Sequence, residues 1–133
     1  MSLQERAIEY FETKKYNCCQ AVVCAYCDEY GVEDETIFKL AEGFGGGMGG
    51  MQETCGAVTG AFMAISIANS AGKKEVPTET KAQTYAYVSE LAEAFQKKQG
   101  SLLCRELKTN RTACIQCVQT GAELVENFLK SHK

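Results

Sequence analysis

Apolar residues recur every three or four positions along most of the chain, which is the spacing of a helix that buries one face. The pattern is clearest in residues 3–14, 18–30, 80–99 and 112–129. A shorter segment of the same kind covers residues 33–41. No segment alternates apolar and polar residues in the way that a half-buried strand does. The pattern therefore predicts an all-α fold, in which the helices pack into a bundle.

Residues that commonly begin and end helices stand at the ends of these segments. Asn17 precedes the second segment and Gly31 follows it, as a typical N-cap and C-cap pair would. Thr80 and Gln83 have the spacing of a capping box at the start of the long segment that Gly100 ends. The sequence thus predicts five to six helices joined by short turns.

The middle of the chain has a different composition. Six of the twelve glycines lie between Gly43 and Gly50, and the most apolar stretch of the sequence follows them, from Cys55 to Ala71. Glycine suits positions that need a positive φ or a close backbone approach. The stretch after it is apolar nearly all round, as a buried helix is. We therefore expect one domain over residues 1–133, packed around a central helix that a glycine-rich loop precedes.

The charged residues narrow the classes of partner. The chain has 14 basic and 17 acidic residues, and the basic ones are scattered rather than gathered in a stripe, which argues against nucleic acid binding. Glu5, Arg6 and Glu9 interrupt the apolar run that a signal peptide needs, so we expect a cytoplasmic protein. The apolar run 56–68 is too short to insert into a membrane.

Cysteine is unusually frequent. The chain has eight cysteines but a single histidine, His132, close to its end. Without a secretion signal, this many cysteines more often indicate metal binding or catalysis than a disulfide framework. The lack of other histidines argues against a Cys-His nucleophile pair, a Ser-His-Asp triad and histidine-based metal sites. Any chemistry must therefore depend on sulfur.

The predicted helix starts divide the cysteines. A short turn is also predicted over residues 102–107, which Ser101 can cap. Four cysteines lie in or beside a predicted first turn, where backbone N–H groups favour a thiolate and lower its pKa: Cys18, Cys55, Cys104 and Cys114. Three lie further inside helices, where cysteine usually acts as a small buried apolar residue: Cys24, Cys27 and Cys117. Cys19 is close to the same helix start as Cys18, so the sequence does not assign it to either of these two groups.

Two C-x-x-C pairs compete with this division, namely Cys24 with Cys27 and Cys114 with Cys117. A spacing of three places both members of a pair on one helix face, which suits zinc or a dithiol. Neither pair is followed by histidine, which excludes covalent attachment of a c-type haem. A second site that uses Cys19, Cys24, Cys27 or Cys117 therefore stays open.

Several segments carry a resemblance to a known family. Residues 55–60 read Cys-Gly-Ala-Val-Thr-Gly after a glycine-rich run, residues 17–20 read Asn-Cys-Cys-Gln, and residues 100–107 contain Gly-Ser and then Cys-Arg-Glu-Leu. With Cys114, these segments resemble the C_GCAxxG_C_C family, which is regarded as redox-active and is named for four cysteines. The resemblance implies that the functional cysteines are Cys18, Cys55, Cys104 and Cys114.

Two functions from different classes fit four clustered thiols. The first is a redox-active protein that uses an iron–sulfur centre for electron transfer or carries out thiol–disulfide exchange. The second is a non-enzymatic metal-binding or delivery module for zinc or copper, associated with a transporter or an oxidoreductase. The residues do not decide between them, nor whether the protein is an enzyme. The candidate metal ligands are the same four cysteines.

The glycine-rich loop suggests a further role. Its N–H groups could face a cofactor or anion at the start of the following helix, and the candidate binding residues are Gly45, Gly46, Gly47, Gly49 and Gly56. The loop lacks the lysine of a phosphate-binding Walker loop. Met48 and Met51 flank it, and we expect a redox or transport partner, or a second copy of the chain, to approach there.

Overall fold

The computed structural model describes residues 1–132 and is all-α. Its helices, in chain order, are α1 (Leu3–Glu12), α2 (Cys18–Tyr30), α3 (Glu35–Glu42), α4 (Gly45–Met48), α5 (Gly56–Asn69), α6 (Lys81–Gln99), α7 (Cys104–Leu107) and α8 (Arg111–Ser131). Six of the described helices have eight or more residues, and α4 and α7 are single turns. The predicted all-α fold is confirmed.

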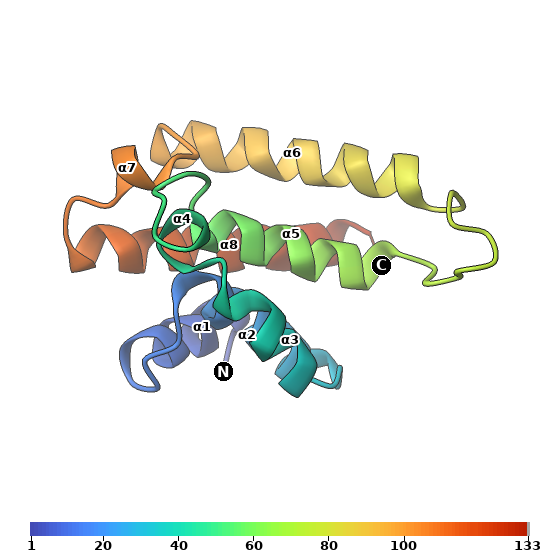
Figure 1. Ribbon diagram of the computed structural model, residues 1–133, viewed down its shortest axis with the longest axis horizontal. Coiled ribbons are helices and arrows are strands. Elements are labelled where there is room, and N and C mark those ends of the chain that lie inside the picture. Colours follow the sequence, from blue (N-terminus) through green and yellow to red (C-terminus); the bar gives the residue numbers. More distant parts are fainter. Residues whose placement is uncertain (133) are drawn as a thin grey trace.

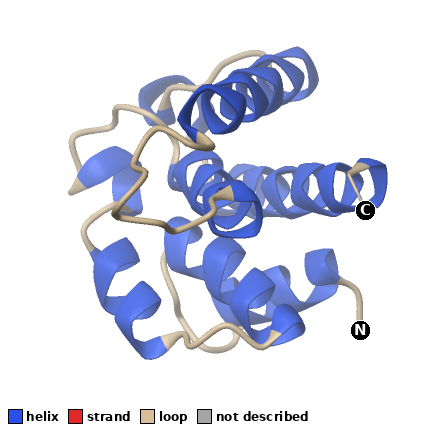
Figure 2. Cartoon of the chain, turned by 90° about the vertical axis from the view of Figure 1, so that its right-hand side faces the viewer, coloured by secondary structure: helices blue, strands red, loops and turns tan. Residues whose placement is uncertain are grey.

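The helices form three layers (Figure 1). The long helix α6 lies alone in the first layer, α5 and α8 form the second, and α1, α2 and α3 form the third. The view turned by 90° shows the same order (Figure 2). The short helices α4 and α7 lie together at one end of the molecule, where α5 and α8 begin. This end holds the candidate site.

Caps set several of the helix starts. The Asn17 side chain accepts a hydrogen bond from the Gln20 N–H, and the Gln20 side chain accepts one from the Asn17 N–H, which completes a capping box for α2. Gly31 ends α2 in the left-handed conformation, with φ of 68°. The capping box predicted at Thr80 is wrong, because its hydroxyl accepts instead from the N–H of Ala71 and closes the preceding loop.

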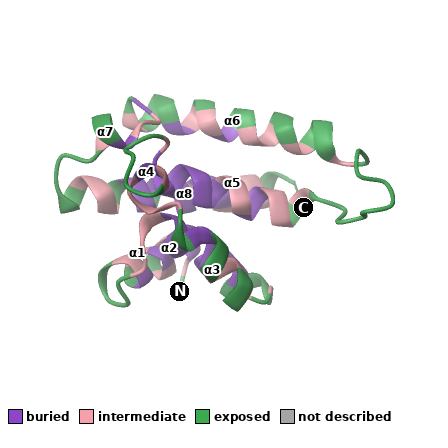
Figure 3. Cartoon of the chain, in the orientation of Figure 1, coloured by how far each residue is buried: buried purple, intermediate pink, exposed green. Residues whose placement is uncertain are grey.

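The core lies where α2, α5 and α8 meet. Residues 19–27 of α2 are buried without interruption, and the N-terminal half of α5 is buried on every side. The C-terminal half of α5 is partly exposed, and the helix ends at Asn69 rather than at the predicted Ala71. Figure 3 shows that most of α6 faces outward, with Leu91 and Phe95 as its buried residues. The core is therefore shared between helices rather than built around α5 alone.

Two glycines allow the core helices to touch. A Cβ on Gly60 of α5 would lie 2.7 Å from the carbonyl oxygen of Cys19 in α2. A Cβ on Gly121 of α8 would lie 2.7 Å from the carbonyl oxygen of Ala57 in α5. Both distances are shorter than van der Waals contact, so each helix pair packs backbone against backbone at these points.

None of the described helices combines the length and the apolar composition that crossing a membrane requires.

Candidate functional site: a pocket lined by cysteines

Four helices begin around one open pocket of about 630 Å³. Cys18 is the first residue of α2, Cys55 directly precedes α5, Cys104 is the first residue of α7, and Cys114 lies in the first turns of α8. All four line the pocket, and Cys117, one turn further along α8, lines it as well. The structure thus brings together the four cysteines predicted from helix starts and adds a fifth.

A short antiparallel contact joins Cys55 and Cys104. The Cys55 N–H donates to the carbonyl of Leu102 over 2.8 Å, and the Cys104 N–H donates to the carbonyl of Glu53 over 2.6 Å. Thr54 lies between these bonds in an isolated bridge to the segment before α7. The sequence gives no sign of this pairing, because each segment is too short to show strand alternation.

The glycine-rich loop provides space for these cysteines. Gly47 has φ of +71°, and a Cβ there would lie 2.6 Å from the Cβ of Cys104. A Cβ on Gly56 would lie 3.1 Å from the Cβ of Cys18. The glycines at these two positions therefore let the backbone pass close to pocket cysteines.

The five glycines predicted to bind a cofactor do not all reach the pocket. Gly46, Gly47 and Gly56 line it. Gly45 instead lies against the side chain of Asn17, because a Cβ there would be 2.7 Å from the amide nitrogen. Gly49 is exposed and is not among the lining residues. A ligand in the pocket would meet three of the five.

Cys55 is the only pocket thiol whose pKa is lowered, to about 7. The main cause is a hydrogen bond from the Cys117 thiol, which favours the charged form of Cys55. Burial opposes this effect, and the N–H groups of Ala57 and Val58 in the first turn of α5 support it. Cys55 is therefore the pocket thiol that most readily forms a thiolate near neutral pH.

The other pocket thiols have raised pKa values, so the predicted lowering at all four helix starts is wrong for three of them. The pKa of Cys18 is raised to about 12, mainly by burial and in smaller part by charges on Cys55, Cys114 and Cys104. Burial is also the main cause for Cys104 and Cys114. The hydrogen bond to Cys55 and burial raise the pKa of Cys117. Helix starts favour thiolates only where burial does not dominate.

The remaining cysteines lie away from the pocket. The Cys19 sulfur is 3.7 Å from the sulfur of Met63, and burial raises the pKa of Cys19 to about 11. Cys24 and Cys27 are buried, at 1% and 0% exposure. All eight cysteines are free thiols. The C-x-x-C pair of α8 therefore lines the pocket, whereas that of α2 does not. The spacing of three residues between Cys114 and Cys117 was the sequence signal that could have placed Cys117 in the site.

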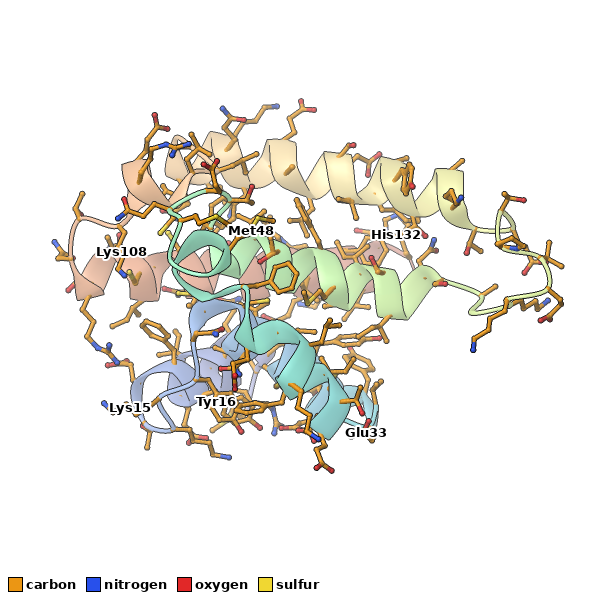
Figure 4. All side chains as sticks on the ribbon, viewed as in Figure 1. Lys15, Tyr16, Glu33, Met48, Lys108 and His132 are labelled. Atoms are coloured by element: carbon orange, nitrogen blue, oxygen red, sulfur yellow. The ribbon has the colours of Figure 1, made fainter. Side chains whose placement is uncertain are left out.

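The thiols are spread along the pocket wall. Among residues 1–132, no three histidine, cysteine, aspartate or glutamate side chains come close enough to hold one metal ion. Of the two flanking methionines, Met51 is 65% exposed, and Met48 is partly buried in the loop (Figure 4). The cysteine side chains in this arrangement therefore do not fit a single metal ion. Thiols distributed over the pocket wall fit a larger ligand better.

Comparison with known proteins gives two matches. A protein from Archaeoglobus fulgidus, described as an uncharacterized protein, is 26% identical over an alignment of 144 positions, gaps included, which covers 98% of this chain and 95% of the relative. No solved structure matches. A family model described as "Putative redox-active protein (C_GCAxxG_C_C)" matches residues 16–128, a span that includes all five pocket cysteines. The chain therefore belongs to the C_GCAxxG_C_C family.

Proposed function

We propose that this protein is a dithiol–disulfide redox protein in which Cys55 is the reactive thiol. The observation that supports it best is the position of Cys55, which lines an open pocket at the start of α5 beside a second thiol, Cys117. Nucleophilic cysteines act as thiolates, and they occur at accessible helix N-termini where N–H groups stabilise the charge. Cys55 has the helix-start position and the stabilising N–H groups. It is buried, with 6% of its surface exposed, and lines the pocket, and its neighbour Cys117 supplies the second sulfur.

The chemistry needs one external disulfide. The Cys55 thiolate attacks one sulfur of that disulfide, the S–S bond breaks, and one thiolate leaves. The Cys117 proton passes to the departing thiolate, and the Cys117 sulfur then attacks Cys55 in the mixed disulfide and releases the second thiolate. The protein loses two electrons as the Cys55–Cys117 bond forms, and the external disulfide gains them. The reverse sequence would reduce the protein.

An iron–sulfur centre is the second candidate function. It is favoured by the spread of thiols around the pocket, because a cluster takes its ligands at several corners rather than at one point. Cys18, Cys55, Cys104 and Cys114 would hold it, and it would supply one-electron transfer. A zinc or copper module has less support, because one ion needs at least three donors that converge, and no such group exists among the described residues.

One preparation can separate these functions. The protein is purified without oxygen, and its absorption spectrum and metal content are measured on the same sample. We expect a colourless, metal-free protein. Visible bands with iron and sulfide would instead establish the cluster, and stoichiometric zinc or copper would establish the metal-binding module.

The thiol chemistry is then tested directly. The reduced protein is equilibrated with a small thiol and its disulfide, and the products are mapped by mass spectrometry. We expect a disulfide between Cys55 and Cys117 that disappears in Cys55→Ala and persists in the control Cys24→Ala. A protein that stays fully reduced, or one whose disulfide does not include Cys55, would contradict the proposal.

A further inference from the structure

The pocket is lined by lysine and arginine but by no carboxylate, although the chain is acidic overall. The sequence has 17 acidic and 14 basic residues. Among the described residues that line the pocket, two are charged, and both are cationic: Lys108 and Arg111. Figure 4 labels Lys108 on the segment between α7 and α8. A pocket lined by cations and by no carboxylate favours the binding of a negatively charged ligand.

Both cationic residues are exposed members of the pocket lining, and the local fold fixes the backbone of Lys108 and the guanidinium of Arg111. Lys108 ends α7, where its N–H donates to the carbonyl of Cys104 over 2.8 Å. The Arg111 guanidinium lies 4.8 Å from the centre of the Phe11 ring and donates to the Phe11 carbonyl over 3.4 Å. Within residues 1–132 neither side chain forms an ion pair, whereas nearby Arg105 is paired with Glu53 at 3.1 Å.

The pocket has the size and lining of a small-molecule site. Its volume of about 630 Å³ lies within the range of roughly 300–1,000 Å³ that such sites occupy. Leu107 and Phe11 give it apolar surface. Asn17 and Asn110 also line it, with side chains that cap α2 and α8. A ligand with an apolar middle and anionic ends would match this lining.

We infer that the pocket binds a small disulfide that carries carboxylate groups, with its carboxylates on Lys108 and Arg111 and its S–S bond against Cys55. This inference rests on the proposed thiol–disulfide function and names its substrate class. The dianionic disulfide takes two electrons from Cys55 and Cys117 and is cleaved to one carboxylate-bearing thiol, which receives the Cys117 proton, and one carboxylate-bearing thiolate. Arginine and lysine are the usual partners of carboxylates.

Lys108 also affects the thiols, and the test must separate this effect from binding. Its charge acts to lower the pKa of Cys18, Cys104 and Cys114. Loss of Lys108 therefore raises the pKa of these three thiols whichever disulfide is used. The rate with a neutral disulfide measures a change in thiol reactivity alone. The rate with the anionic disulfide divided by the rate with the neutral one therefore measures recognition of the substrate charge.

The experiment compares three small disulfides of similar size at one pH. Reduced protein is mixed with dithiodipropionate (anionic), hydroxyethyl disulfide (neutral) or cystamine (cationic), and modification of Cys55 is followed by quenched mass spectrometry. We expect the anionic disulfide to react at least about tenfold faster than the neutral one at low salt, with the cationic one slowest. Added salt should reduce this preference.

Matched variants locate the effect. The anionic preference is the rate with the anionic disulfide divided by the rate with the neutral one. In Lys108→Gln combined with Arg111→Gln, we expect this ratio to fall to about the value that a simple thiol in solution gives with the same two disulfides. Lys130→Gln combined with Lys14→Gln removes the same charge outside the pocket lining and should keep the preference. Equal rates for all three disulfides with a reactive Cys55 would overturn the inference and leave the proposed function intact.

A binding measurement covers the case in which Cys55 does not react. Suberate has the length of dithiodipropionate but no S–S bond, and its binding is measured by calorimetry on the reduced protein. We expect saturable binding that weakens about tenfold or more in the double pocket variant and is unchanged in the Lys14, Lys130 control. Binding without reaction would support the anion site and reject the proposed function, whereas no binding and no anionic preference would overturn the inference.

Discussion

At the scale of single residues, Cys18 and Cys55 show why position at a helix start does not by itself define a reactive thiol. Both lie where a helix begins, yet the pKa of Cys55 is lowered to about 7 and that of Cys18 is raised to about 12. Cys55 accepts hydrogen bonds from Cys117 and from two N–H groups, whereas burial dominates for Cys18. Hydrogen bonds to the charged form decide between two otherwise similar positions.

This difference predicts the effect of Cys117→Ala. The variant removes the strongest contribution that lowers the pKa of Cys55, so we expect that pKa to rise from about 7 towards the ordinary value of about 8.5. The pH dependence of iodoacetamide labelling at Cys55, followed by mass spectrometry, measures it. Cys27→Ala, which removes a buried thiol of α2 outside the pocket lining, should leave the midpoint unchanged. An unchanged midpoint in Cys117→Ala would show that Cys117 does not stabilise the thiolate.

At the scale of elements, the glycine contacts between helices fix how the pocket is assembled. Gly60 places α5 directly on the backbone of α2 beside Cys19, and Gly121 places α8 on α5 beside Ala57. These contacts hold the helices that carry Cys18, Cys55 and Cys114. A displacement at either contact would separate the pocket thiols, so packing of the core and geometry of the site are coupled.

Gly60→Ala tests this coupling. Helix propensity alone would make the variant more stable by up to about 1 kcal/mol. Because the new Cβ would lie 2.7 Å from the Cys19 carbonyl oxygen, we expect overpacking to lower the free energy of unfolding by about 1–3 kcal/mol instead. Urea unfolding in reducing buffer measures the change.

The matched control is Gly43→Ala. Gly43 has φ of −74°, and a Cβ at this position would have no neighbouring atom within 4 Å. The free energy of unfolding should therefore change by less than about 0.5 kcal/mol. A stabilised Gly60→Ala protein would show that α2 and α5 are not in close backbone contact.

At the scale of the whole molecule, the buried thiols link stability to pH. Burial raises the pKa of Cys19 and Cys27 to about 11 and that of Cys24 to about 12. A raised folded pKa gives stability that is fully present below the unfolded pKa of about 8.5 and is lost as pH rises towards the folded value. Cys55 acts in the opposite sense, because its folded pKa of about 7 adds stability as pH rises from 7 to the unfolded pKa.

We therefore expect the reduced protein to lose stability steeply above about pH 9. Each buried thiol should lower the free energy of unfolding by up to about 1.4 kcal/mol per pH unit between the unfolded and folded pKa values. Urea unfolding between pH 7 and 10.5 with reductant present, about one measurement per half unit, tests this. Cys24→Ala should show a shallower decline, and a flat profile above pH 9 would contradict the expectation.

Much of the fold could be predicted because helices depend on local pattern. The bounds of α2 follow directly from Asn17 and Gly31, since a cap acts on its own turn. The Thr80 capping box failed because a loop nine residues away competed for the same hydroxyl. The pairing of residues 52–55 with 102–105 was invisible for a similar reason, as it joins segments far apart in the chain.

The sequence alone determined the helices and the cysteines at their starts, because periodicity and capping are local properties of the chain. Only the tertiary structure decided that four of these starts meet at one pocket, that Cys117 joins them and that Cys24 and Cys27 do not. It also decided which thiol is activated, because burial and hydrogen bonding depend on neighbours that are distant in sequence.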